Sequence, residues 1–512
     1  MMSAKQFFMA SAVLLFAIVA AAADKKVVNY RDFGAKGDGK TNDLPAIAKA
    51  HEYANQHNLP VRADDNATYL LEDGPAPVVI QTDVNWGKAK FIVNDLADIK
   101  NFRSPLFQVR STLPEYTISE LKPLKRGQTN IGIKLPSRMY IYMEDATTKR
   151  YIRYGANANK GTNQQDTVLV DKDGNIDPAT PIVWDFKAVT SIKAYPVDEK
   201  LLTVKGGHFT TYTNNRTGRH IYFGRNISVT RSNTLVQGVK HFVVEPEGID
   251  SWPYTGFLSV SRCAEVTFKN CVVTGRKVYS YPVPGQKKRK TTGTYDISGT
   301  SALKISYINV VQANDFMDPV YWGVMGTNFC KSVLLDGCKI SRFDAHQGVT
   351  NAIIRNSEMG YQGINAIGFG TFLIENTVSR CLSRFVNFRS DYGAMWNGDF
   401  IIRNCKFIPG NAFNLCLFGG PATPEHDFGY PCMMPENITI DGLQVDMSKV
   451  ERSKFLAVFG DFDRHNKNPE SKQPYVFTKK LNVKKFTCNG PVKLAHNPEQ
   501  FKNMKVNGKL PK

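Results

Sequence analysis

Residues 27–43 read VVNYRDFGAKGDGKTND, a short apolar strand pattern followed by a turn that contains three glycines. Glycines permit a tight backbone here, and Thr41 or Asn42 is suited to cap a helix that runs from about residue 43 to residue 56. Apolar residues recur on one face of that segment at three- and four-residue spacing. The stretch therefore predicts a strand, a turn and an amphipathic helix, the arrangement that closes the open end of a stack of repeats.

Short apolar runs repeat from about residue 200 onward, and each ends in a charged residue followed by Asn or Gly. They are Val266–Asn270, Val333–Gly337, Ile353–Asn356, Phe372–Asn376, Phe400–Asn404 and Ile438–Gly442. Asn and Gly tolerate the left-handed backbone of a sharp turn. Successive closing positions at 337, 356, 376 and 404 lie 19, 20 and 28 residues apart, which fits coils of about twenty residues with loop insertions. The repeat predicts stacked coils of parallel strands.

Segment 27–43 resembles the opening motif of the pectate-lyase-like β-helix superfamily, in which a strand, a Gly-rich turn and a Thr-x-Asp sequence lead into a capping helix. The resemblance implies an all-β protein: a single-stranded, right-handed parallel β-helix with an N-terminal capping helix. It also implies activity on a polysaccharide, because lyases, epimerases and glycoside hydrolases use this scaffold.

The N-terminus has the pattern of a secretory signal peptide over residues 1–23, with Lys5, an apolar run over 7–19 and small residues before the cleavage region. We expect residues 24–512 to form one β-helix domain. Its expected parts are the cap motif (24–60), elaborated first coils (61–200), regular coils (201–460) and a C-terminal coil with a tail (461–512). The first cysteine is Cys263, so no lipid anchor is expected, and we predict a soluble, exported monomer of the periplasm or medium.

The formal net charge of +19 favours anionic partners. Export argues against nucleic acid, and no basic amphipathic helix points to a membrane, which leaves an acidic polysaccharide as the expected partner. Nine cysteines are an odd number, and no disulfide scaffold is predicted at this size. Cys271, Cys338 and Cys405 each follow a closing Asn or Gly directly, so we expect them to stack as a ladder of small buried side chains.

Polar clusters recur in the coils between residues 305 and 400, at 314–322, 342–348 and 387–393. Ligands of a β-helix bind along an outer face where successive coils line up, so clusters of equal phase are site candidates. The predicted substrate contacts are Asp315, Asp318, Tyr321, Trp322, Tyr361 and Asp391.

The sequence Asp344-Ala345-His346-Gln347, followed by residues 351–357, resembles the Asp-Pro-His-Glu region of mannuronan C5-epimerases. That resemblance implies that Asp344 and His346 act at the C5 proton of a uronate. Ala345 stands where that family has proline, and Ser341 stands where its catalytic tyrosine falls, so Tyr361 or Tyr392 is needed to supply a phenol from another coil.

Cleavage of a uronate chain by β-elimination removes the C5 proton, and this needs a neutralised carboxylate, a base and a proton donor. We expect His346 to be the base, Asp344 to orient it, Arg389 to neutralise the carboxylate and Tyr392 to donate the proton. The scheme assigns no cofactor, and a requirement for Ca²⁺ stays open. Ca²⁺ or the basic run at 287–290 can also neutralise the carboxylate, and no metal ligands are assigned.

Two other functions stay open on this scaffold. A glycoside hydrolase needs two carboxylates, about 5 Å apart for retention or roughly 6.5–9.5 Å apart for inversion, and Asp315, Asp318, Asp344 and Asp391 are the candidates. The motif series of polygalacturonases is not found in order. A non-catalytic, tailspike-like glycan-binding protein would instead present aromatic platforms such as Tyr321, Trp322 and Trp396.

Overall fold

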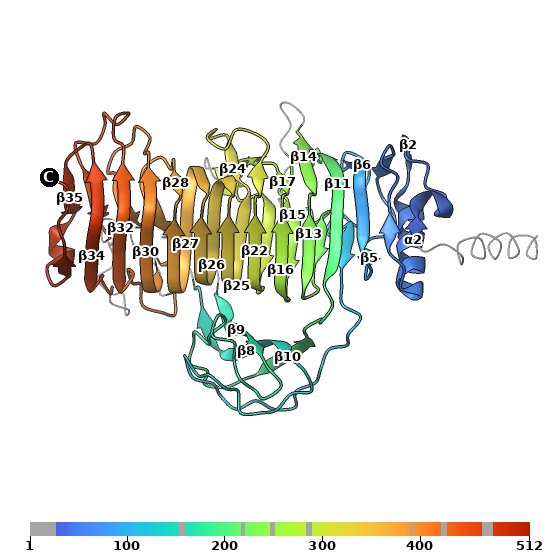
Figure 1. Cartoon of the computed structure of the whole chain (residues 1–512), viewed down its shortest axis with the longest axis horizontal. Coiled ribbons are helices and arrows are strands. Elements are labelled where there is room, and N and C mark those ends of the chain that lie inside the picture. The colour runs from blue at the N-terminus through green and yellow to red at the C-terminus, as the bar shows by residue number, and fades with distance from the viewer. Residues whose placement is uncertain are drawn as a thin grey trace, which may run out of the picture.

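The structure, a computed structural model, describes residues 27–152, 160–216, 221–245, 251–282, 289–389, 392–393, 395–420, 428–462 and 475–512. The predicted signal peptide, Asp391 and the first half of the basic run lie outside these residues. Coils of short strands stack along one axis from the N-terminal helix to the C-terminus, and strands of successive coils pair in parallel (Figure 1). The chain is a right-handed parallel β-helix, as the sequence predicts.

The solenoid has three faces, each a column of parallel strands. The first, which we call the groove sheet, contains β5 (Val78–Ile80), β7 (Phe107–Val109), β12 (Ile227–Val229), β15 (Thr255–Ser261), β21 (Tyr295–Thr300), the start of β25 (Met325–Asp336), the middles of β26 (Lys339–Arg355) and β27 (Glu358–Glu375), β29 (Arg384–Phe388), β31 (Cys416–Gly419), β33 (Leu456–Phe459) and β35 (Val492–Ala495).

The other two faces continue the same coils. The second contains β1 (Val28–Asn29), β3 (Val61–Arg62), the start of β6 (Val84–Asn94), the start of β11 (Leu202–Tyr212), β13 (Thr234–Gln237), β16 (Ala264–Lys269), β22 (Leu303–Ile308), the ends of β25, β26 and β27, β30 (Trp396–Phe407), β32 (Asn437–Val445), β34 (Lys480–Cys488) and β36 (Lys505–Asn507). The third contains β2 (Asp38–Asn42), β4 (Thr68–Leu71), the ends of β6 and β11, β14 (Lys240–Val244), β17 (Val272–Val273), β23 (Val311–Gln312), the starts of β26 and β27, β28 (Val378–Ser379) and the ends of β30, β32 and β34.

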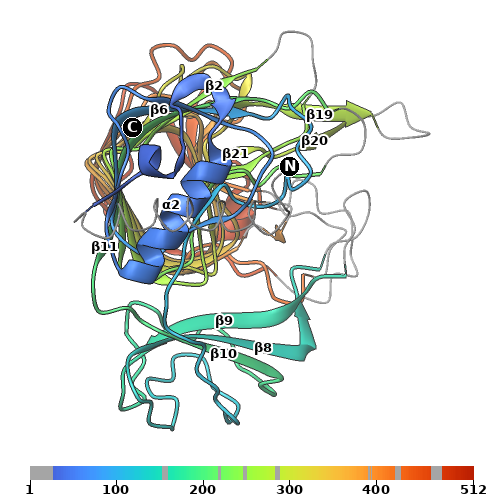
Figure 2. The same ribbon diagram turned by 90° about the vertical axis from the view of Figure 1, so that its right-hand side faces the viewer.

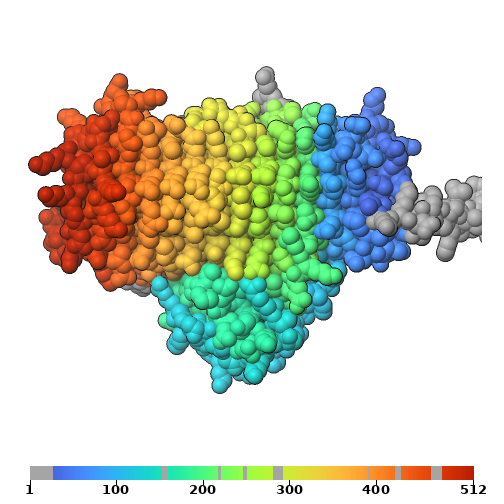
Figure 3. Space-filling model, in the orientation of Figure 1, coloured from blue at the N-terminus to red at the C-terminus, as the bar shows by residue number. Residues whose placement is uncertain are grey.

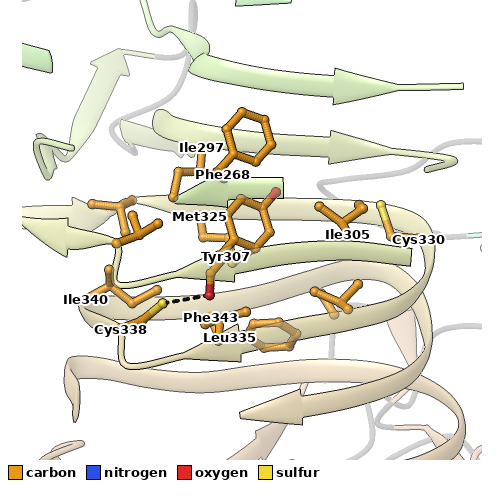
Figure 4. Close-up of a cluster of buried hydrophobic side chains, with 14 of the residues drawn as sticks. Phe268, Ile297, Ile305, Tyr307, Met325, Cys330, Leu335, Cys338, Ile340 and Phe343 are labelled. Atoms are coloured by element: carbon orange, nitrogen blue, oxygen red, sulfur yellow. Dashed lines mark hydrogen bonds between the residues drawn. The ribbon is translucent and has the colours of Figure 1, made fainter. Parts of the chain in front are cut away.

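Alternate side chains of the strands in these three faces point into one continuous apolar interior. Equivalent residues of neighbouring coils stack there, as the rings of Phe268 and Tyr307 do with centroids 5.3 Å apart (Figure 4). Cys338 Sγ donates to the backbone oxygen of Tyr307 in the preceding coil at 3.2 Å. No disulfide joins the nine cysteines. Cys271, Cys338 and Cys405 are buried, and the backbone hydrogen bonds between coils place them in one column with Ser357 and Thr377, so the predicted ladder is confirmed.

The corner between the second and third faces is built from left-handed residues at the predicted closing positions. Asn356, Asn376 and Asn404 have φ of 51°, 47° and 49°, and Gly337 and Gly442 occupy the same corner in other coils with positive φ. Asn376 Nδ2 donates to Asn356 Oδ1 of the coil below at 3.3 Å. The asparagines therefore supply both the backbone conformation and a side-chain ladder at the surface.

Replacing Asn376 by alanine should lower the free energy of unfolding by about 1–2 kcal/mol, because alanine is strained in the left-handed backbone conformation that asparagine tolerates. Asn376→Gly is the matched control, since glycine accepts this φ and also lacks the amide. Urea unfolding of both variants measures the difference. A loss in the glycine variant as large as that in the alanine variant would mean that the side-chain ladder, and not the backbone, sets the cost.

The N-terminal end is closed by α2 (Leu44–His57), which confirms the predicted helix to within a residue at each end. The Asp43 carboxylate accepts the backbone N–H groups of Lys36 and Gly37 at 2.6 and 3.0 Å and so ties the glycine turn to the start of the helix. Apolar residues of one helix face lie against the first coil. The 3-10 helix η1 (Tyr30–Phe33) precedes the glycine turn, and η4 (Pro498–Phe501) lies near the last coil.

Residues 61–200 are not all coils, which corrects the predicted division of the chain. Strands β8 (Met139–Arg150), β9 (Thr162–Val170) and β10 (Ser191–Pro196) form a separate antiparallel sheet with its own apolar cluster. This insertion forms a lobe below the middle of the solenoid (Figure 3). Arg138 pairs with Glu265 at 2.8 Å, and Lys331 pairs with Asp166 where neither side chain is exposed, so ion pairs join the lobe to the coils.

Two small antiparallel pairs extend from the loops of the central coils. They are β18 (Arg276–Lys277) with β24 (Tyr321–Gly323), and the hairpin of β19 (Tyr279–Pro282) with β20 (Arg289–Thr292). Seen from the N-terminal end, the hairpin projects on the same side as β21, and the insertion hangs below (Figure 2). The groove sheet thus has a projection on either side. No helix in the described part of the chain has the length and apolar character needed to cross a membrane.

Candidate functional site

A row of polar and small residues runs along the outer surface of the groove sheet. Inward neighbours such as Leu258, Ile297 and Phe343 belong to the core, so the residues that alternate with them face outward. The strand register aligns Gln108, Ser228, Ser259, Ser298, Gly326, Asp344, Asn365 and Asn387 in successive coils. Asp344 is the one carboxylate of this row and lies near its middle.

Asp344 is held between two arginines. Arg389 Nη1 lies 2.5 and 2.7 Å from the two carboxylate oxygens, and Arg342 Nη2 lies 2.8 Å from Oδ2. Asp344 has no exposed surface and Arg342 is only 5% exposed. Two guanidinium groups thus share one carboxylate on the outer face of the coil. The Nε of Arg342 is buried and has no acceptor.

The charge state of Asp344 follows from these neighbours. Burial alone raises the pKa of a carboxyl, but the positive charges of Arg342 and Arg389 outweigh it here and hold the pKa of Asp344 below its ordinary value. Asp344 is therefore a carboxylate at neutral pH. A residue in this state cannot donate a proton, but it can fix the position of two guanidinium groups.

Aromatic residues cover the arginine side of the cluster. The guanidinium of Arg342 lies over the Trp322 ring, with its carbon 4.5 Å from the ring centroid. The ring of Tyr295 lies over Gly326, where a Cβ atom would be 2.8 Å from the ring. Burial raises the pKa of Tyr295, and the Asp344 carboxylate raises it further, so the phenol stays protonated at neutral pH.

His346 follows Asp344 by two residues on the same outer face. Its Nδ1 lies 3.2 Å from Oδ1 of Asn328 in the preceding coil. Since an amide oxygen can only accept, this bond places a proton on Nδ1, and the neutral form of the ring then carries its lone pair on Nε2. The ring of Tyr392 meets that of His346 edge-on, with centroids 4.9 Å apart. Asn328 is thus a hydrogen-bond partner of His346, and Asp344 interacts with the imidazole through its charge.

The structure brings all four predicted catalytic residues to one place, in the arrangement just described. Arg389 bonds to Asp344, and Tyr392 is 3% exposed, with its backbone oxygen accepting from Tyr430 at 2.5 Å. The predicted contact Trp322 also belongs to this place. Asp391 lies outside the described residues.

The other predicted substrate contacts lie in the loop before β24 or next to it. Asp315 Oδ1 accepts the N–H of Met317, and Asp318 Oδ1 accepts that of Val320, both at 2.9 Å, so both carboxylates stabilise turns of their own loop. Tyr321 is in β24, and the backbone of Tyr361 bonds to this loop through Phe316.

Sequence reasoning did not assign Arg342, Tyr295 or Asn328. Arg342 stands in the polar cluster at 342–348 but received no role. Tyr295 and Asn328 come from the two preceding strands of the groove sheet, and aligning those two coils with residues 342–348 would have been the signal. No group of three or more His, Cys, Asp or Glu side chains suited to a metal ion is found among the described residues. Asp344, with two guanidinium partners, does not have the surroundings of a Ca²⁺ ligand.

No family model matches this chain, and no curated protein matches it. Among solved structures, the Gp54 tailspike of Acinetobacter baumannii bacteriophage AP22, in complex with a capsular saccharide, is 11% identical with a TM-score of 0.46, over 90% of this chain and 76% of the tailspike. The Streptococcus pneumoniae adhesin PfbA is 12% identical with a TM-score of 0.41, over 91% of this chain and 100% of the adhesin. An exopolygalacturonase of Thermotoga maritima is 9% identical with a TM-score of 0.32, over 91% and 92%. At these values the likeness extends to no shared activity.

Proposed function

We propose that this protein is an exported enzyme that cleaves a uronic-acid-containing polysaccharide by β-elimination on the groove sheet. The observation that carries the proposal is the Arg342–Asp344–Arg389 cluster, which fixes two guanidinium groups around one carboxylate, two residues from His346 on the same strand. A positive charge that is already fixed in place stabilises the enolate-like transition state formed when a uronate loses its C5 proton.

Each step of the elimination has a candidate group. The C5–H bond breaks as Nε2 of His346 takes the proton, the C4=C5 double bond forms, and the C4–O bond breaks. The leaving oxygen takes a proton from a phenol. Tyr392 is the donor expected from the sequence, but Tyr295 is more exposed, and its raised pKa keeps it protonated. We therefore propose Tyr295 as the donor and Tyr392 as a wall that supports the His346 ring.

The ionisation of Asp344 weighs against hydrolysis at this place. A glycoside hydrolase needs one carboxyl group that is protonated at working pH. The two arginines hold Asp344 in the opposite state, and Asp315 and Asp318 are bound to the backbone of their own loop. A glycan-binding protein without turnover would use the same positive face, so it is the alternative that an assay must separate.

The test is incubation of the full chain with a panel of uronate polymers and with neutral glycans as controls. Elimination yields an unsaturated uronate whose conjugated double bond absorbs in the ultraviolet, whereas hydrolysis yields reducing ends without that absorbance. We expect absorbance to rise with one or more uronate polymers and with no neutral glycan. Reducing ends without absorbance, or binding without any product, would refute elimination.

A further inference from the structure

A second buried arginine opens onto the same flank as the candidate site. Arg276 is in β18, which pairs with β24 so that Arg276 lies opposite Gly323. A Cβ atom on Gly323 would lie 2.7 Å from Cβ of Arg342, so the backbone of β24 separates the two arginines. Arg276 lies over Tyr254, at the start of the coil that contains β15, and Arg342 is in β26. The strand order β15, β21, β25, β26 separates the two arginines by three strand spacings, or about 14 Å along the solenoid axis.

Arg276 is 2% exposed, and its hydrogen-bonding groups are only partly used. Nη2 lies 3.5 Å from Oδ1 of Asp296, and the guanidinium carbon lies over the ring of Tyr254, 3.9 Å from its centroid. Nε and Nη1 have no acceptor. Donors buried in this way cost free energy unless something accepts from them.

Asp296 does not satisfy the remaining N–H donors of Arg276, because its carboxylate also accepts hydrogen bonds from other groups. Both of its oxygens lie 2.8 Å from Nδ1 of His241, and Oδ2 accepts the backbone N–H of Thr274 at 2.8 Å. The other buried carboxyl of this region, Asp95, is bound by Arg225 at 2.7 Å and by the hydroxyl of Tyr254 at 2.9 Å. The acceptors in the interior are thus committed to other donors.

The guanidinium lines a cavity of about 80 Å³. Its walls include Trp252, Tyr254 and Tyr279, and also Glu245, whose carboxylate pairs with Lys277 at 3.6 Å. The exposed Lys277 and Val278 at its rim place the mouth at the surface. It lies where β18 leads into the projecting hairpin β19–β20. The cavity is much smaller than the roughly 300–1,000 Å³ that encloses a whole drug-sized ligand, so it suits a substituent rather than a sugar ring.

We infer that this cavity is a subsite for an oxyanion substituent of the glycan, a carboxylate or a sulfate ester, which accepts from Nε and Nη1 of Arg276. Guanidinium donors match such oxygens in geometry and charge, and the aromatic walls suit the apolar face of the sugar that carries the group. The choice of a sugar rests on the proposed function. Anion binding at Arg276 does not, because it requires no turnover.

The test is calorimetric titration of the full chain with glucuronate, with glucose 6-sulfate and with the uncharged methyl ester of glucuronate. We expect at least one of the two anions to bind, the ester to bind at least tenfold more weakly, and Arg276→Gln to weaken anion binding by roughly ten- to hundredfold, the range for hydrogen bonds to a charged group. Whichever anion binds identifies the substituent. Arg403→Gln, at a surface arginine of a distant coil, is the matched control and should bind as the parent does.

Loss of Arg276 can also unfold the chain, so a second variant leaves the arginine in place. Ser251→Phe puts a ring into the cavity from its wall and should abolish binding with Arg276 intact. Absence of binding by either anion in the parent chain, or equal binding by the ester or by the Ser251→Phe variant, would overturn the inference and leave a cavity filled by water. Binding without elimination would count against the proposed function alone, and elimination without binding at Arg276 against this inference alone.

Discussion

Replacement of Asp344 by asparagine should lower the free energy of unfolding by about 3–5 kcal/mol at pH 7. The variant keeps the shape of the side chain but removes the carboxylate that bonds to both Arg342 and Arg389, and so takes a shared counter-charge from two guanidinium groups with little exposed surface. The cost of that uncompensated charge exceeds the loss of the hydrogen bonds themselves. Urea unfolding followed by tryptophan fluorescence measures it.

Glu375→Gln is the control for this experiment. Glu375 also pairs with an arginine of a neighbouring coil, Arg403, at 2.8 Å, but the arginine side chain is 45% exposed. Surface pairs contribute about 0–1 kcal/mol, so the control should lose little. If Asp344→Asn lowered the free energy of unfolding no more than Glu375→Gln does, the Asp344 carboxylate would not stabilise the two arginines. The guanidinium groups that we assign to catalysis would then lack the residue that holds them in position.

The difference in the free energy of unfolding between the parent and Asp344→Asn should depend on pH in one direction. The pKa of Asp344 is lower in the folded chain than the ordinary aspartate value of about 3.9. A depressed pKa contributes stability that is present above the unfolded-state value and is lost as pH falls through the folded-state value. The difference in the free energy of unfolding between the parent and Asp344→Asn should therefore be largest at pH 7 and should decrease as pH falls below about 4.

The solenoid was predictable because its decisive features are local. The glycine turn and helix at 27–57 and the closing residues Asn356, Asn376 and Asn404 are where the sequence places them, since each depends on a backbone conformation that only a few residue types accept. The insertion was not predictable in the same way. Strands such as Met139–Arg150 show the alternation of any strand, and alternation does not reveal whether the partner runs parallel or antiparallel.

Several residues of the site could be predicted from the sequence, but the contacts between them could not. Asp344, His346 and Arg389 stand in polar clusters that recur from coil to coil, and such clusters attract attention without a structure. Their pairing depends on register, which is interrupted in β26 between Ile340 and Arg342 and between Ala345 and Val349. These irregularities shift the phase of the outer face, so the sequence did not show that Arg342 would share Asp344 or that Asn328 would take the place beside His346.

Removal of the imidazole in His346→Ala should reduce kcat for elimination by about 10²- to 10⁴-fold, the usual contribution of a positioned general base. The fold should survive, because His346 is on the outer face and is only half-buried. His208→Ala is the matched control: that histidine is a half-buried residue of β11, on another face of the solenoid, and its loss should leave kcat unchanged. Initial rates of absorbance increase on the uronate polymer found in the panel, with unfolding midpoints taken in parallel, separate lost chemistry from lost structure. Full activity in His346→Ala would remove the imidazole from the reaction, and the positive cluster around Asp344 would then have to serve a different base or only binding.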